Sequence, residues 1–388
     1  MGPLSRRGFL GAVAVGAAAG WGSALRAGTA AAEAAGPGIA LIHATDLFRP
    51  HADPDDHFDL ATVFALAARG RFDLLAVMID HPPAGLAADP DVQAVAQMNR
   101  ITGLAVPALT GSLRPAAGSE KAADGGLDPA AGAKALLGIM RRSTRPVAVS
   151  VVGSARDVAL AGRLEPKLFA AKCAGVYLNS GSGTPDKALA ARLEYNVSLD
   201  PVSYAAMFDL PCPLYWLPCF EVAPGGGAPW AVAEFGTYYR FPQKDLWPRL
   251  SPRLRNYFAF MLKQGESDRA DQAEAEALRP NWLRYLEGPN EEALLGRQGG
   301  RPRNMWSTAG FFHAAGLEVG ADGAAGPLGR VPSPVYTLDP VRVRCGADGV
   351  TEWSPDPGSR DRFLFHVRDK ERYAAAMTAA LAGLLAGL

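Results

Sequence analysis

Residues 39–59, IALIHATDLFRPHADPDDHFD, combine an apolar strand pattern with a dense group of acids. Ile39–His43 is a short apolar run that predicts a strand, and Phe58–Ala68 has the pattern of a helix. From the end of this strand into the helix, the chain carries Asp46, Asp53, Asp55, Asp56 and Asp59. In an open α/β sheet, a strand-to-helix turn lies at the ligand crevice beyond the strand ends. The stretch therefore predicts both a fold and the place of a site.

Carboxylates that meet at one point repel one another unless a cation or raised pKa values relieve them. Hard cations such as Ca²⁺ prefer oxygen ligands of this kind, so a metal site is the leading interpretation. Helix capping is the alternative, because Asp is common at the N-cap and in the first turn. The four acids between positions 53 and 59 exceed what one cap requires, which favours a site.

The N-terminus has the pattern of an export signal. Residues 5–10 (SRRGFL) precede an Ala/Gly/Val-rich run, and residues 29–32 (TAAA) precede Glu33. A twin-arginine start with a small-residue cleavage site predicts a signal peptide over residues 1–32 and a periplasmic or secreted mature protein. The alternative, a membrane anchor, is disfavoured because Gly and Ala dominate the run and Arg26 interrupts it.

The charge balance excludes a basic nucleic-acid-binding protein. The chain has 39 basic and 39 acidic residues, and residues 1–32 contain three arginines and no acid, which leaves 36 against 39. The remaining ~355 residues suit one large α/β domain, here assigned to residues 38–388. We expect a small-molecule partner, and contact with the membrane only during export. The sequence does not decide whether the protein forms a homo-oligomer.

The four cysteines have no Cys-x-x-Cys spacing, so a zinc site is not expected. Cys212 and Cys219 are either a disulfide or buried free thiols, and the sequence leaves both interpretations open.

Apolar runs alternate with amphipathic stretches through the mature chain, which predicts an α/β fold with a doubly wound, mostly parallel sheet flanked by helices. The expected strands are Ile39–His43, Leu74–Ile79, Val106–Thr110, Val147–Val152, Ala174–Leu178, Pro213–Leu217, Val341–Cys345 and Arg362–His366. Besides Phe58–Ala68, the expected helices are Asp91–Thr102, Ala131–Arg142, Ala155–Ala161, Pro201–Phe208 and Asp369–Leu385. Residues 230–310 are rich in aromatic residues and predict a mainly helical insertion near the crevice.

The first strand and its acids resemble the start of the inosine/uridine-preferring nucleoside hydrolase superfamily. That family opens with a strand ending in Asp-x-Asp-Pro-Gly-x-Asp-Asp and binds a calcium ion there. The resemblance places Asp46 at the second acid and Asp55 and Asp56 at the closing pair, with Asp53 as a rival to Asp46. It implies that Asp46 and Asp56 hold Ca²⁺ and that Asp55 is the general base. The chain departs from the pattern at Ala44, which replaces the first acid, and in the insertion 47–53.

Two further blocks carry the resemblance. Residues 151–158 (VVGSARDV) resemble a family strand and turn whose backbone carbonyl ligates calcium, which implies the carbonyl of Arg156. Residues 194–201 (EYNVSLDP) resemble a Glu-Phe-Asn block followed by Asp-Pro, in which Glu and Asn bind ribose hydroxyls. The resemblance therefore implies substrate binding by Glu194 and Asn196, with Asn179 at the preceding strand end. Turn and cap roles are the alternative for Asn196 and Asp200.

The C-terminal half departs from the family, which usually places an Asp there, often after a His. The corresponding residues 303–310 (RNMWSTAG) contain neither. Thr308, Ser307 or Asn304 offers a neutral oxygen that calcium accepts, and we assign Thr308 to the metal. Trp306 is placed to stack on an aromatic leaving base. His81 and His313 are candidates for the proton donor.

The resemblance implies hydrolysis of the N-glycosidic bond of a ribonucleoside or related ribosyl compound, with calcium orienting the water and the ribose hydroxyls. One alternative is a non-catalytic exported sugar- or nucleoside-binding protein on the same fold. Another is a hydrolase of a different glycoside. A haloacid-dehalogenase-like phosphatase, suggested by Asp53-Pro54-Asp55, is disfavoured because ten residues separate Asp53 from His43 at the strand end.

Overall fold

The structure, a computed structural model, describes residues 38–49, 55–82, 89–112, 128–224, 230–270, 277, 279–289 and 301–388. The predicted signal peptide and Asp53 lie outside the described residues. Within the described residues, no helix combines the length and the apolar character needed to cross a membrane.

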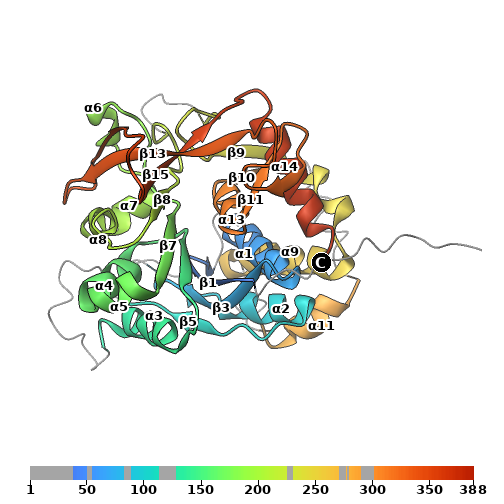
Figure 1. The fold of residues 1–388 in the computed structure, drawn as a ribbon. Helices are drawn as coiled ribbons and strands as arrows, with labels where there is room; N and C mark the ends of the chain where they lie inside the picture. The colour runs from blue at the N-terminus through green and yellow to red at the C-terminus, as the bar shows by residue number, and fades with distance from the viewer. Residues whose placement is uncertain are drawn as a thin grey trace, which may run out of the picture. The chain divides into compact units, whose positions relative to one another are not determined.

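A nine-stranded sheet forms the centre of the domain (Figure 1), in the order β14-β13-β15-β8-β7-β6-β1-β3-β5. The strands from β15 to β5 are parallel, whereas β13 and β14 add an antiparallel edge. This confirms the predicted mostly parallel sheet. The strands are β1 (Ile39–Thr45), β3 (Phe72–Ile79), β5 (Ala108–Thr110), β6 (Val147–Val151), β7 (Cys173–Leu178), β8 (Leu214–Trp216), β13 (Tyr336–Cys345), β14 (Thr351–Pro355) and β15 (Arg362–Val367).

Helices cover both faces of the sheet, as a doubly wound fold requires. Figure 1 shows α3, α4 and α5 on one side and α1, α9 and α14 on the other. The first face is packed by α3 (Ala131–Arg142), α4 (Arg156–Leu164), α5 (Pro166–Lys172) and α8 (Pro201–Met207). The second is packed by α1 (Asp55–Ala68), α2 (Val92–Thr102), α9 (Pro252–Ala270), α13 (Thr308–Ala314) and α14 (Tyr373–Leu385).

Strand β1 shows why the sheet needs two helical layers. Leu41 belongs to the core on one face, whereas its neighbours Ala40 and Ile42 belong to the core on the other face. Side chains alternate along a strand, so an apolar run such as this one must be covered on both sides.

The remaining elements are short. In the segment 230–310 the described residues contain helices together with an antiparallel β9–β10 ladder. The short elements are β2 (Phe48–Arg49), β4 (Asp89–Pro90), β9 (Tyr239–Pro242), β10 (Pro302–Met305), β11 (Leu317–Val319), β12 (Ala325–Pro327), α6 (Lys187–Ala190), α7 (Tyr195–Leu199), α11 (Trp282–Glu287), and the 3₁₀ turns at Gln243–Asp245, Trp247–Arg249 and Arg279–Asn281.

The strand order places a topological switch between β1 and β6. From β1 the chain proceeds to β3 and β5 on one side, then returns to β6 on the other side and continues to β7 and β8. Ligand crevices of open parallel sheets form beyond the carboxyl ends of the strands at such a switch.

Candidate active site at the carboxyl edge

The candidate site is built from residues that directly follow neighbouring strands. Backbone hydrogen bonds hold these strand ends together: Asp80 N donates to Thr45 O (2.9 Å) and Asn179 N donates to Val151 O (2.8 Å). Asp46, Asp80 and Asn179 follow β1, β3 and β7 respectively, so they lie along one edge of the sheet.

Gly153, just after β6, allows these strand ends to approach closely. A Cβ atom at this position would lie 2.7 Å from the backbone nitrogen of Asp46 and 2.8 Å from Asp80 Oδ2. Any other residue would push apart the turns after β1, β3 and β6, so glycine is required by close approach.

Asp46 and Asp56 are hydrogen-bonded to each other, and Thr45 Oγ1 donates to Asp56 Oδ1 at 2.9 Å. Burial raises the pKa of Asp46 well above its usual value, and the charges of Asp80 and Asp55 raise it further. Burial likewise raises the pKa of Asp56, with the Asp46 charge as the next cause. The raised pKa values favour a proton held by this pair, which relieves the repulsion between the two carboxyl groups.

Two more carboxyl groups belong to this neighbourhood, although the sequence analysis gave neither of them a role. Asp59 is only 1% exposed, and its charge raises the pKa of Asp56. Burial raises the pKa of Asp59 itself to about 7, partly offset by a hydrogen bond to Ser307. Asp59 Oδ1 has no hydrogen-bond partner among the described residues.

Asp80 is the second of these groups. Burial raises its pKa to about 7 against the opposing charge of Arg156, and its Oδ2 accepts from Ser154 N at 2.7 Å. The sequence signal that could have identified Asp80 was its position directly after the expected strand Leu74–Ile79. Asp59 had a comparable signal, since it lies one helical turn beyond Asp55 and Asp56.

The two residues implied to bind ribose approach the acids through the end of β6. Asn196 Nδ2 donates to Val152 O at 2.8 Å, and its buried Oδ1 has no partner among the described residues. Between Asn196 and Glu194, the half-exposed Tyr195 has its pKa raised by burial and then by the charges of Asp46 and Asp56. The structure therefore brings this block next to the acid group.

Glu194 is fixed by its own chain. Its Oε1 accepts from Asn196 N (2.9 Å), which caps α7, and its Oε2 accepts from Gly181 N (2.9 Å) and Ser180 Oγ (3.2 Å). Burial raises its pKa in spite of these bonds. The backbone nitrogen of Val197 also donates to this carboxylate, so the protein's own groups hold Glu194 in place.

Asn179 and Cys219 also lie at the carboxyl ends of the strands, after β7 and β8 respectively. Asn179 Nδ2 donates to Leu217 O (2.6 Å) and Thr237 Oγ1 (3.0 Å), so its Oδ1 is the atom available to a ligand. The Cys219 thiol donates to Asn179 O at 3.7 Å. Burial raises the pKa of this thiol, followed by the charges of Glu194 and Asp55, which places Cys219 between the two groups of acids.

Trp306 belongs to an aromatic cluster beside Cys219, formed with Phe220, Trp230 and Tyr238. Its ring centroid lies 5.9 Å from that of Phe220 and 5.8 Å from that of Tyr238. Its Nε1 is buried and has no partner among the described residues. The cluster connects to the acids through the next residue in the chain, Ser307, which bonds Asp59.

Thr308 and Arg156, both assigned to the metal from sequence, make other contacts with their side chains. Thr308 Oγ1 pairs with Tyr239 OH at 2.8 Å, so Ser307 rather than Thr308 is the hydroxyl residue in contact with a carboxyl of the group. The Arg156 guanidinium donates to Ser154 Oγ (3.1 Å) and Ser112 O (3.3 Å). Its backbone carbonyl as a ligand stays a prediction.

The environments of both candidate histidines disfavour the protonated form that a proton donor needs. His313 Nδ1 pairs with Tyr177 OH at 3.2 Å, and burial lowers its pKa to about 4, so it is neutral near pH 7. Burial also lowers the pKa of His81, and the nearby Arg156 charge adds to this.

The donor chemistry of the site suits a hard cation. Carboxylates and the unpartnered amide oxygen of Asn196 are ligands of the kind that Ca²⁺ prefers. Within the described ranges, no three His, Cys, Asp or Glu side chains are arranged to hold a metal ion.

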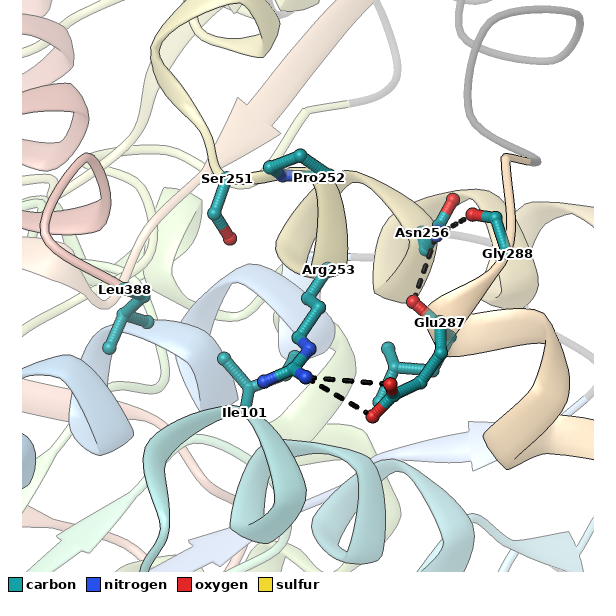
Figure 2. A pocket seen from close by; sticks show the side chains of 9 residues that line it. Ile101, Ser251, Pro252, Arg253, Asn256, Glu287, Gly288 and Leu388 are labelled. Carbon is teal, nitrogen blue, oxygen red and sulfur yellow. Dashed lines mark hydrogen bonds and ion pairs between the residues drawn. The ribbon is translucent and has the colours of Figure 1, made fainter.

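A separate cavity of about 450 Å³ opens among α2, α9 and α11 (Figure 2). Its residues pair with one another: Arg253 forms an ion pair with Glu287 at 3.3 Å, and Asn256 Nδ2 donates to Leu286 O at 2.9 Å. It contains none of the residues that the sequence assigned to the site.

No protein-family model and no curated protein sequence matches the chain. Similar solved structures include a plant nucleoside hydrolase, with 14% identity over 89% of this chain and 99% of that chain and a TM-score of 0.49. A purine-preferring ribonucleoside hydrolase from Gardnerella vaginalis has 13% identity over 90% and 100%, with a TM-score of 0.46. An inosine-uridine preferring nucleoside hydrolase from Bacillus anthracis has 11% identity over 88% and 99%, with a TM-score of 0.41. All three are nucleoside hydrolases, but likenesses of this strength carry no argument about activity.

Proposed function

We propose that the protein is a hydrolase that cleaves the N-glycosidic bond of a ribonucleoside or a related ribosyl compound. The observation that carries the proposal is the meeting of two sets of residues at one sheet edge. The buried pair Asp46–Asp56 comes from the turn after β1 and from α1. On α7, the charges of this pair raise the pKa of Tyr195, and Asn196 bonds Val152 O just after β6.

Cleavage of this bond develops positive charge on the sugar and requires a water on the opposite face of the ring. We assign Asp55, in the first turn of α1, as the base that accepts a proton from this water. Its place beside the carboxyl pair supports the assignment, because Asp55 precedes Asp56 in the chain and its charge raises the pKa of Asp46.

Asp46 and Asp56 are the proposed carboxylate ligands of Ca²⁺, with the Arg156 carbonyl as a proposed neutral ligand. Thr308, the other neutral ligand proposed from the sequence, would have to give up its bond to Tyr239 OH to take this role. When bound, the ion supplies positive charge that acidifies water and orients sugar hydroxyls. The pair itself must lose the proton it holds before it can act as a ligand, so cation binding and proton release are linked.

Glu194, Asn196 and Asn179 form the proposed sugar-binding side. Asn196 and Asn179 each offer an amide oxygen while their amide nitrogens are held by the protein, and the carboxylate of Glu194 is fixed by its own chain. Residues that are locked in this way position a substrate precisely enough for reaction, at little entropic cost on binding. Trp306 is the proposed stacking partner for an aromatic leaving base, since its cluster borders the acids through Cys219 and Ser307.

A second candidate function is a binding protein without turnover. It is favoured by residues 303–310, which contain neither the Asp nor the His that the family usually places there. Such a protein would retain a sugar-binding edge and lack activated water.

The test measures release of reducing sugar from a panel of ribonucleosides and other glycosides, with Ca²⁺ and with a chelator. Ribose release that depends on Ca²⁺ in wild type and is lost in Asp55→Asn supports the hydrolase. Binding of ribose without release by either protein supports the binding protein instead. Release of reducing sugar from other glycosides, and from no ribonucleoside, would show that the substrate is a different class of glycoside.

We also propose export through the twin-arginine route to the periplasm or the medium, on the motif at residues 5–10. Changing Arg6 and Arg7 to Lys should trap the precursor in the cytoplasm. Unchanged secretion of that variant contradicts the proposal.

A further inference from the structure

Cys173 and Cys212 lie opposite each other at the starts of two neighbouring parallel strands. Cys173 is the first residue of β7, and Cys212 lies just before β8. The ladder between these strands pairs Val176 with Leu214, and it is extended backwards by a hydrogen bond from Val176 N to Pro213 O at 2.9 Å.

A bulge in β7 aligns the two cysteines. On its other side, β7 pairs Cys173 with Val147 and Gly175 with Ala148, so Ala174 is an extra residue. Counting back from the Val176–Leu214 pair and leaving Ala174 out places Cys173 level with Cys212.

Both side chains face the same core, the one packed by α3, α4, α5 and α8. Each residue is 7% exposed, and the two thiols are hydrogen-bonded to each other. Adjacent strands lie about 4.8 Å apart, and disulfides form between Cα atoms about 4.4–6.8 Å apart. The two backbones are therefore spaced as a disulfide requires.

The other two cysteines lie elsewhere. Cys219 follows the carboxyl end of β8 and donates to Asn179 O, so β8 itself separates it from Cys212. Cys345 ends β13. The natural partner of Cys212 is thus Cys173 and not Cys219, the pairing that the sequence left open.

We propose that Cys173 and Cys212 are a redox pair that closes to an intramolecular disulfide when the protein meets a small-molecule disulfide oxidant. One cysteine, as its thiolate, attacks the oxidant to give a mixed disulfide and releases one thiol. The second cysteine then displaces the other half of the oxidant. Overall, two protein thiols are oxidised and one disulfide is reduced to two thiols, with no further electron source.

Closure would join the ends of the segment 173–212, which carries Asn179, Glu194 and Asn196. A disulfide stabilises mainly by restricting the unfolded chain, and a segment of this length gives a substantial effect. The inference stands on strand register and thiol contact, and it holds whether or not the proposed hydrolysis is correct.

The test uses the full chain, refolded or held at moderate denaturant with oxidised glutathione, because both thiols are buried. The expected result is the loss of two hydrogen atoms in the intact mass, a Cys173–Cys212 linked peptide in non-reducing digests, and a Tm several degrees higher that dithiothreitol reverses. A bond between Cys212 and Cys219, or four thiols that all remain open to alkylation after unfolding, overturns the proposal.

Matched variants separate the pair from the other thiols. Cys173→Ser and Cys212→Ser should each abolish the linked peptide and the rise in Tm. Cys219→Ser and Cys345→Ser should keep both. If the first two variants fold poorly, the peptide map of the wild type still decides the outcome.

Discussion

The pKa values of carboxyl groups shift in opposite directions in two regions of the sheet. The first region is the candidate site beyond the carboxyl ends of β1 and β3, and the second is the antiparallel pair β13 and β14. On β14, Glu352 binds Lys187 Nζ at 2.6 Å and Arg344 at 2.7 Å, and these partners lower its pKa to about 2. On β13, the His366 hydrogen bond helps to lower the pKa of Asp339. Beyond β1 and β3, by contrast, burial raises the pKa of Asp46 and Asp80.

The difference shows which acids serve the fold and which are available for chemistry. Solvated ion pairs cost the protein little and are common on surfaces. Buried carboxyl groups that raise one another's pKa cost stability, and groups of this kind cluster at functional sites. The predictions below break or sharpen this contrast.

The largest effect is expected from Asp55→Asn. The substitution keeps the shape of the side chain and removes the proposed proton acceptor, so sugar release should fall by about 100-fold or more. Calcium affinity should change much less. Steady-state release of reducing sugar, together with calorimetric Ca²⁺ titration, checks both statements, and full activity in the variant would remove Asp55 from the mechanism.

An intermediate effect is expected from Asn196→Ala. Loss of the unpartnered Oδ1 removes one hydrogen bond to the sugar, a change of about 1 kcal/mol or roughly fivefold in kcat/KM. The α7 cap through Glu194 uses the backbone nitrogen of residue 196 and should persist. An unchanged kcat/KM for every active substrate would place the sugar elsewhere.

Asp59→Asn tests the electrostatics in metal-free protein. The folded pKa of about 7 lies above the ordinary value of 3.8, so the stability that the protonated form provides is lost as pH rises from 3.8 to 7. Near pH 8 the wild type holds a buried charge that the variant lacks, so the variant should have the higher Tm. The difference in Tm should shrink steadily as pH falls from 7 towards 3.8. A Tm difference that does not change with pH would contradict a raised pKa.

The smallest effect is expected at the antiparallel edge. Glu352→Gln removes two exposed ion pairs, so it should leave sugar release and Ca²⁺ affinity unchanged and shift Tm only slightly. A loss of activity comparable to Asp55→Asn would erase the contrast between the two edges.

The sequence was informative where a residue's position along a strand decided its place. Asp46 and Asn179 directly follow expected strands, and parallel pairing brings such positions to one edge. Glu194 was found through the resemblance of residues 194–201. Helix α3 begins and ends where its pattern predicted, at Ala131 and Arg142. The amphipathic period and the buried strands are local signals, so they could be read without a structure.

The sequence was silent where pairing between distant segments decides. Asp80 joins the acids only because β3 lies beside β1. Ser307 rather than Thr308 reaches Asp59 because of how α1 and the start of α13 meet. The β9–β10 ladder in the segment expected to be mainly helical depends on strands sixty residues apart. The position of Asp80 after a strand was a local signal, but which segments pair with each other was not.

Calcium titration of wild type and Asp56→Asn, each freed of metal, tests the central claim most directly. We predict saturable binding by wild type that weakens as pH falls, because the Asp46–Asp56 pair must release its proton, and at least tenfold weaker binding by the variant. Equal affinity of the two proteins for Ca²⁺, or no binding by wild type, would contradict a metal site at this edge.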